Sequence, residues 1–85
     1  MMNNKNKLSI ARIKYSAIKL KSYNQIPMQL YLLIEKLNKD SSEKEIKFLY
    51  DETEHFLRVR GYWKKHHDQE KIANKIILDD YHKLQ

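Results

Sequence analysis

Apolar residues recur every three or four positions along most of this chain, which is the spacing of one face of an α-helix. The pattern is clearest from 42 to 60. Ser42 and Glu45 predict a capping box at its start, because each side chain can bond the backbone N–H of the other residue. Gly61 follows as a natural helix end. The apolar face of this helix consists of Ile46, Leu49, Tyr50, Thr53, Phe56 and Leu57.

Two further helices are predicted before it, at 7–23 and 27–38. Pro27 suits the first turn of the second one, where its missing N–H is not needed. The apolar stripe of 7–23 is Ile10, Ile13, Ala17 and Leu20, with Ala11 and Ile18 at its sides. The stripe of 27–38 is Leu30, Leu33, Ile34 and Leu37, widened by Met28, Tyr31 and Leu32.

A fourth helix is predicted at 68–84, with Asp68 as a candidate N-cap. Its expected inner face is Ile72, Ile76, Ile77, Tyr81 and Leu84. No segment alternates in the manner of a strand, and residues 1–6 are polar enough to be disordered. The short connection before Ser42 makes antiparallel neighbours of the second and third helices. We therefore expect one domain, 1–85, folded as an all-α bundle of three to four helices.

Charge is distributed unevenly along the chain. The formal net charge is +6. Residues 1–25 contain six basic side chains and no acidic one, and residues 26–85 contain 11 of each. The whole excess of positive charge therefore lies in residues 1–25. There is no cysteine, which excludes disulfides and thiolate zinc sites. The apolar runs are far shorter than a membrane span, and the N-terminus lacks the pattern of a signal peptide. We expect a cytoplasmic protein that does not enter a membrane.

The basic side chains of the first helix are the first candidate site. They are Arg12, Lys14, Lys19 and Lys21. They could lie near DNA phosphates or an acidic partner, and binding would then weaken steeply with salt. The alternative is a solvated helix face without a partner.

The third helix carries the second candidate site, an acidic patch formed by Asp51, Glu52 and Glu54 beside His55. Two carboxylates can act as general acid and base only where a desolvated pocket separates their pKa values. One glycine and one proline leave little material for the loops of such a pocket. We expect the patch to dock another protein rather than to catalyse, with solvated surface charge as the competing interpretation.

Two weaker signals come from histidines and aromatic residues. His55, His66, His67 and His82 lack the spacing typical of zinc ligands, so no metal or other cofactor is predicted. Tyr62, Trp63, Lys64 and Lys65 could stack on nucleic-acid bases. We favour the alternative in which the two aromatic residues close the end of the core.

Several short pieces in this order and spacing resemble the Hha/YmoA family of small helical modulators of the nucleoid protein H-NS. They are Ile18-Lys19-Leu20-Lys21, Ile26, Ile34-Glu35-Lys36, Ser42, Glu45-Ile46, Leu49-Tyr50 and Glu54-His55-Phe56-Leu57. The resemblance covers about residues 16–57. Phe56 departs from it, because the family usually has arginine there, and Glu52-Thr53 replace a pair of alanines.

The resemblance implies a non-enzymatic function without a small-molecule substrate. The family docks on the dimerisation region of H-NS-type proteins through the acidic residue that corresponds to Glu54, with its neighbour at His55. Its basic side chains add positive charge to the protein–DNA filament, and only Lys19 and Lys21 occupy matching basic positions. DNA contact would be indirect or weak.

Two rival functions stay open. One is a small helical immunity or inhibitor protein, of phage or bacteriocin type, that binds a single protein target. The other is a direct DNA reader, which ranks lower because no helix-turn-helix glycine turn is evident.

Overall fold

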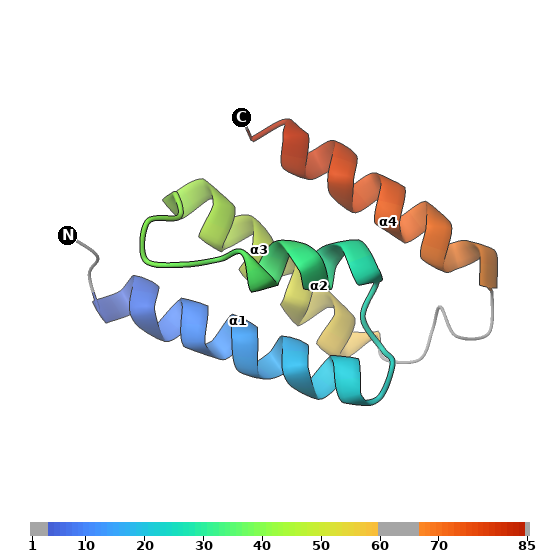
Figure 1. The fold of residues 1–85 in the computed structure, drawn as a ribbon, viewed down its shortest axis with the longest axis horizontal. Coiled ribbons are helices and arrows are strands. Elements are labelled where there is room, and N and C mark those ends of the chain that lie inside the picture. The colour runs from blue at the N-terminus through green and yellow to red at the C-terminus, as the bar shows by residue number, and fades with distance from the viewer. Residues whose placement is uncertain (1–3, 60–66, 85) are drawn as a thin grey trace.

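The computed structural model describes residues 4–59 and 67–84, and these form four helices and no strand (Figure 1). The helices are α1 (Asn4–Ser22), α2 (Met28–Glu35), α3 (Glu43–Arg58) and α4 (His67–His82). α2 and α4 run back against the direction of α1 and α3. The predicted all-α bundle is confirmed. Predictions for residues 1–3, for Gly61 and for the aromatic segment 62–65 lie outside the described residues.

α1 begins earlier than predicted and ends in a Schellman motif. Residues 4–6, expected to be disordered, are helical. Lys5 and Asn6 lie beside the first turns of α3, a tertiary contact that the local sequence does not reveal. At the other end Asn24 takes the left-handed conformation (φ 54°), which asparagine tolerates better than most residues. The Gln25 N–H then donates to the Leu20 carbonyl (2.8 Å), and this reverses the chain toward α2.

α2 is shorter than the predicted 27–38 and is capped by another helix. Pro27 precedes it and offers no side-chain cap. The side chain of Asn74 in α4 supplies one, because its Oδ1 accepts from the Gln29 N–H (3.1 Å). The helix ends at Glu35, and beyond it the side chain of Asn38 donates to the Lys36 carbonyl. Such local side-chain bonds compete with helix continuation, which explains the early end.

α3 confirms the predicted start but only half of the capping box. The Ser42 hydroxyl accepts from the Glu45 N–H at 3.1 Å. The carboxylate of Glu45 has a different use, because its Oε1 accepts from the Tyr81 hydroxyl of α4 (2.8 Å). In the middle of α3 the buried Thr53 hydroxyl donates to the Leu49 carbonyl, so this polar group is satisfied inside the core.

The core forms where α1, α2 and α3 meet. The predicted inner faces of these helices are confirmed in their central positions, whereas Ile10, Tyr50 and Leu57 are only partly buried. The buried apolar side chains of these three helices and their connections are Ile13, Ala17, Leu20, Ile26, Leu30, Leu33, Ile34, Leu37, Ile46, Leu49 and Phe56. α3 packs chiefly against α1, and α4 chiefly against α2.

The predicted inner face of α4 is wrong for two of its residues. Ile77 is buried and Tyr81 packs against the core, but Ile72 and Ile76 are half exposed. The face that contacts the bundle consists of Ala73, Ile77 and Tyr81, at steps of four residues. α4 also begins at His67, which puts Asp68 inside the helix rather than at its N-cap.

Candidate protein-binding surfaces on α1 and α3

The acidic residues of α3 do not form one patch. Successive residues of a helix are turned by about 100°, so Glu52 points away from Asp51 and Glu54, which are only about 60° apart around the helix. Glu54 faces α1, Glu52 faces α4, and Asp51 is exposed between them. The three carboxylates are close together, but they face different neighbours. Each must therefore be considered with its own neighbours.

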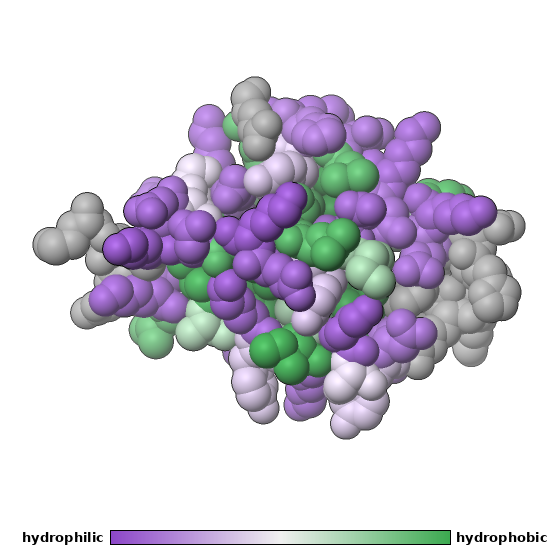
Figure 2. Space-filling model, in the orientation of Figure 1, coloured by the Kyte–Doolittle hydropathy of each residue, from purple (hydrophilic) through white to green (hydrophobic). Residues whose placement is uncertain are grey.

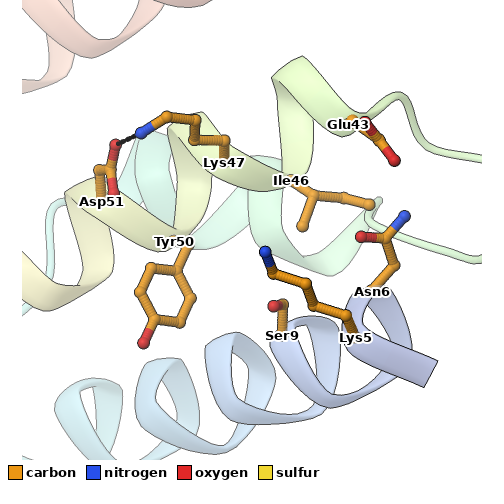
Figure 3. A pocket seen from close by; sticks show the side chains of 8 residues that line it. All are labelled: Lys5, Asn6, Ser9, Glu43, Ile46, Lys47, Tyr50 and Asp51. Carbon is orange, nitrogen blue, oxygen red and sulfur yellow. Dashed lines mark hydrogen bonds and ion pairs between the residues drawn. The ribbon is translucent and has the colours of Figure 1, made fainter. Parts of the chain in front are cut away.

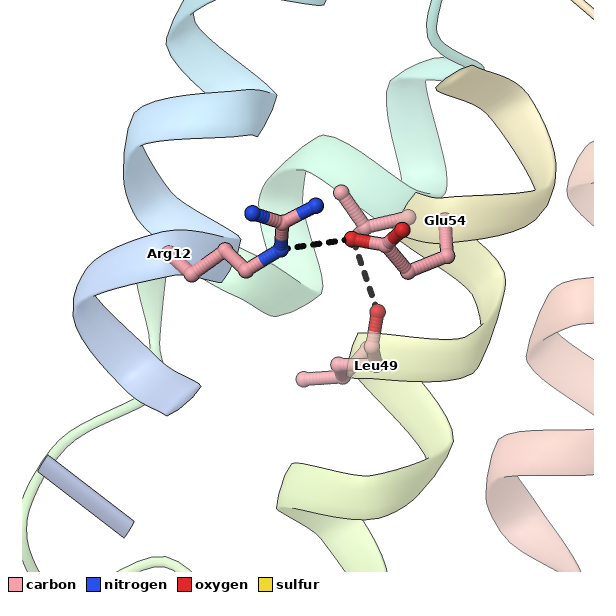
Figure 4. Close-up of polar contacts among 4 residues, drawn as sticks. Arg12, Leu49 and Glu54 are labelled. Atoms are coloured by element: carbon pink, nitrogen blue, oxygen red, sulfur yellow. Dashed lines mark hydrogen bonds and ion pairs between the residues drawn. The ribbon is translucent and has the colours of Figure 1, made fainter. Parts of the chain in front are cut away.

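Glu54 is joined to α1 by an ion pair (Figure 4). The Arg12 Nε donates to the Glu54 Oε1 at 2.8 Å, with 56% of the arginine side chain and 23% of the glutamate side chain exposed. This hydrogen bond and the negative charge of Glu54 raise the pKa of the Arg12 guanidinium further above its usual value. The predicted docking carboxylate is thus occupied by one of the predicted DNA-proximal residues. The acidic and basic surfaces meet along one edge and do not lie on opposite sides.

Glu52 is half-buried on the side of α3 that faces α4. Loss of solvent raises the pKa of its carboxyl group, and the nearby charges of Asp80 and Asp51 raise it further. His55 acts in the opposite direction and lowers it. Asp80 lies near Lys83, whose Nζ is 3.7 Å away. The negative charge of Glu52 is therefore energetically unfavourable at the interface of α3 and α4, and its carboxylate is not an accessible docking group.

Asp51 and His55 lie on the outer side of α3. Asp51 accepts from Lys47 one turn earlier in the same helix (2.9 Å), and both side chains are well exposed. The His55 ring meets the Phe56 ring edge-on, with 5.1 Å between the ring centroids. Asp51 and His55 are therefore the two predicted docking residues that face outward from the bundle.

The predicted basic residues of α1 have different surroundings. Arg12 binds Glu54, as described above. The Lys21 Nζ lies over the Tyr31 ring of α2, 5.3 Å from its centroid, in a cation–π contact. Lys14 borders a shallow groove beside Tyr31 and Glu35, and Lys19 is exposed. These side chains line both edges of α1 rather than a single basic face.

An open groove of about 580 Å³ separates the start of α1 from α3 (Figure 3). Lys5, Asn6 and Ser9 enter it from α1, and Glu43 and Asp51 are its carboxylates on α3. Eight residues along a helix correspond to about 12 Å, which is too far for the two to share one reacting group. Asp51 is moreover held by Lys47. The groove offers polar lining but no carboxylate pair.

Metal ligands do not gather in the part of the chain that the structure describes. Within 4–59 and 67–84, no group of three His, Asp or Glu residues is placed to hold an ion. His66 lies outside that part. A membrane span would need a longer and more apolar helix than any that the structure describes.

Three exposed hydrophobic residues of α1 were not expected to be functional. Leu8, Tyr15 and Ile18 have 71%, 70% and 63% of their surface exposed. Figure 2 shows hydrophobic side chains reaching the surface among hydrophilic ones along the lower edge, where α1 lies in Figure 1. These three residues lie seven and three positions apart, which is helical spacing. The sequence did not identify them as a separate surface, because the buried stripe of the same helix has a similar period.

No family model, curated protein or solved structure matches this chain.

Proposed function

We propose that this chain is a non-enzymatic, protein-binding modulator of gene expression that docks on an H-NS-type nucleoid protein. The observation that supports it best is the ion pair between Arg12 and Glu54. The pair leaves exposed 23% of the side chain of Glu54, the docking residue that the family resemblance implies. It also couples that carboxylate to the basic helix.

Docking in this proposal is an exchange of partners at Glu54. The Arg12 side chain is 56% exposed and would stay solvated on leaving the pair, whereas Glu54, only 23% exposed, needs a cationic partner in either state. A cationic side chain of the nucleoid protein could therefore replace Arg12 at little cost. The released Arg12 would join Lys14, Lys19 and Lys21 in adding positive charge toward the DNA of the assembled complex. Contact with DNA would be weak, and it would fall steeply as salt is raised.

Titration of the chain with an H-NS dimerisation domain tests this function. Glu54→Lys should abolish binding, because it replaces attraction by repulsion. Arg12→Gln should bind at least as tightly as the unaltered chain, since the internal competitor for Glu54 is gone. Asp79→Lys makes a similar change of charge on the exposed side of α4 and serves as the matched control.

Two results would contradict docking at Glu54. One is equal loss of binding in Arg12→Gln and Glu54→Lys, which would mean that the pair only holds α1 against α3. The other is no binding to any H-NS relative, which would favour the immunity or inhibitor protein instead.

A further inference from the structure

The outer face of α1 carries a second stripe, separate from the one buried in the core. It consists of the exposed residues Leu8, Ala11, Tyr15, Ile18 and Ser22. Their steps of three, four, three and four residues are the a and d positions of a heptad repeat, the seam of a coiled coil. The opposite face of the helix holds Ile13 and Leu20, which are buried in the bundle. The stripe therefore has no partner within the described residues.

Basic residues occupy every position that borders this seam. The e positions are Lys5, Arg12 and Lys19, and the g positions are Lys7, Lys14 and Lys21. In a coiled coil these positions face the partner helix and select it by charge. No acidic residue lies anywhere in α1. Arg12 is already paired with Glu54, so the five lysines supply the positive charge around this apolar seam, and they favour a partner with acidic side chains.

A second copy of the chain does not fit this face. In a parallel pair each g position meets an e position of the other helix, and in an antiparallel pair e meets e and g meets g. Every such contact would bring two cations together. DNA phosphates would satisfy the cations, but they would leave Leu8, Tyr15 and Ile18 in water, because phosphate contacts are polar. A helix with an apolar seam and acidic borders satisfies both features.

We propose that the outer face of α1 binds one amphipathic helix of a partner protein, with apolar a and d residues and acidic e and g residues. This interaction needs neither Glu54 nor an H-NS-type protein, so it goes beyond the function proposed above. It uses the same cations as DNA does, and the acidic helix and DNA therefore compete for α1.

A synthetic peptide of three heptads, with Leu at a and d and Glu at e and g, is the probe. A peptide with Lys at e and g is its matched control. Calorimetry with the full chain should show one acidic peptide bound per chain and at least about tenfold weaker binding of the lysine peptide. Ile18→Gln should weaken acidic-peptide binding about tenfold or more, because it removes a large apolar contact. Ile76→Gln, the same change at an exposed position of α4, should not weaken it.

Ile18 is exposed and glutamine is a good helix former, so the variant should fold, and circular dichroism checks its helicity. Tyr15→Gln is a second variant at the seam with the same expected loss. Glu54→Lys should still bind the peptide but should no longer bind the H-NS dimerisation domain. Failure of the proposed function can therefore be told apart from failure of peptide binding at α1. A short DNA duplex should be displaced by the acidic peptide.

The idea is overturned if the lysine peptide binds as well as the acidic one. It is also overturned if neither seam variant weakens binding. Binding to anionic phospholipid vesicles through Ile18, with no binding of the acidic peptide, would assign the face to a membrane surface instead. Dimerisation of the unaltered chain through Ile18 would assign it to a second copy.

Discussion

Glu52 shows what a single half-buried carboxylate does to this small bundle. Burial and the charges of Asp80 and Asp51 raise its pKa in the folded chain above the ordinary value of about 4.3 in the unfolded chain. A carboxyl group with a raised pKa costs stability once the pH exceeds its unfolded value, and the full cost is reached above its folded value. We expect Glu52→Gln to raise the free energy of unfolding at pH 7 by up to about 0.5 kcal/mol, which is the usual size of such effects near the surface.

The gain from Glu52→Gln should shrink as the pH is lowered and disappear below about pH 3, because Glu52 is then protonated in both states. Urea unfolding at several pH values measures it. Asp79→Asn, an exposed carboxylate-to-amide change on α4, is the control. A gain that is constant with pH would show that charge at Glu52 is not the cause.

The identity of the charged residues in α3 could be read from the sequence, but their neighbours could not. Asp51, Glu52 and Glu54 are close in sequence, and a linear count makes them one patch. Helical rotation turns Glu52 away from Asp51 and Glu54, and which of the three meets another helix depends on the packing of α1 and α4. That Glu54 meets Arg12, 42 residues earlier, follows from tertiary structure alone.

At the scale of elements, α4 depends on the burial of Ile77 rather than Ile76. Ile77 is 3% exposed and Ile76 is 53% exposed, although both were expected on the inner face. Ile77→Ala should lower the free energy of unfolding by about 2–4 kcal/mol, because it removes buried methyl groups and leaves a cavity. Ile76→Ala should change it by about 0.5 kcal/mol or less. Denaturant unfolding of the two variants compares neighbouring positions, and equal losses would contradict the observed orientation of α4.

Periodicity predicted the orientation of the first three helices better than that of the fourth for a physical reason. In α3 the apolar residues form one band and the rest of the surface is mostly polar, whereas α2 has only two polar residues and exposes Met28 and Leu32. α4 has Ile72, Ala73, Ile76 and Ile77, which make a broad band that fits two rotations of the helix equally well. Contacts with α2, including the bond from Gln29 to Asn74, decide between them. α1 is similarly ambiguous, since both of its stripes have helical spacing.

For the whole molecule, the location of the charge matters more than its total. The net charge of +6 arises from residues 1–25, and α1 presents its cations on both sides of an exposed apolar seam. Like-charge contacts of this kind act against self-association. The chain is therefore expected to stay monomeric even though a large hydrophobic face is open.

Changing the charge on one side of the seam should convert this monomer into a parallel dimer. In Lys7→Glu/Lys14→Glu, each new glutamate at a g position would meet Arg12 or Lys19 at an e position of the second copy, as parallel pairing requires. Antiparallel pairing would still oppose cations at the e positions. Sedimentation velocity should show concentration-dependent dimers for this variant and monomers for the unaltered chain. Lys39→Glu/Lys44→Glu lowers the net charge equally at exposed positions outside α1 and should stay monomeric. If both double variants dimerise, net charge alone prevents association, and the heptad arrangement of α1 has no part in it.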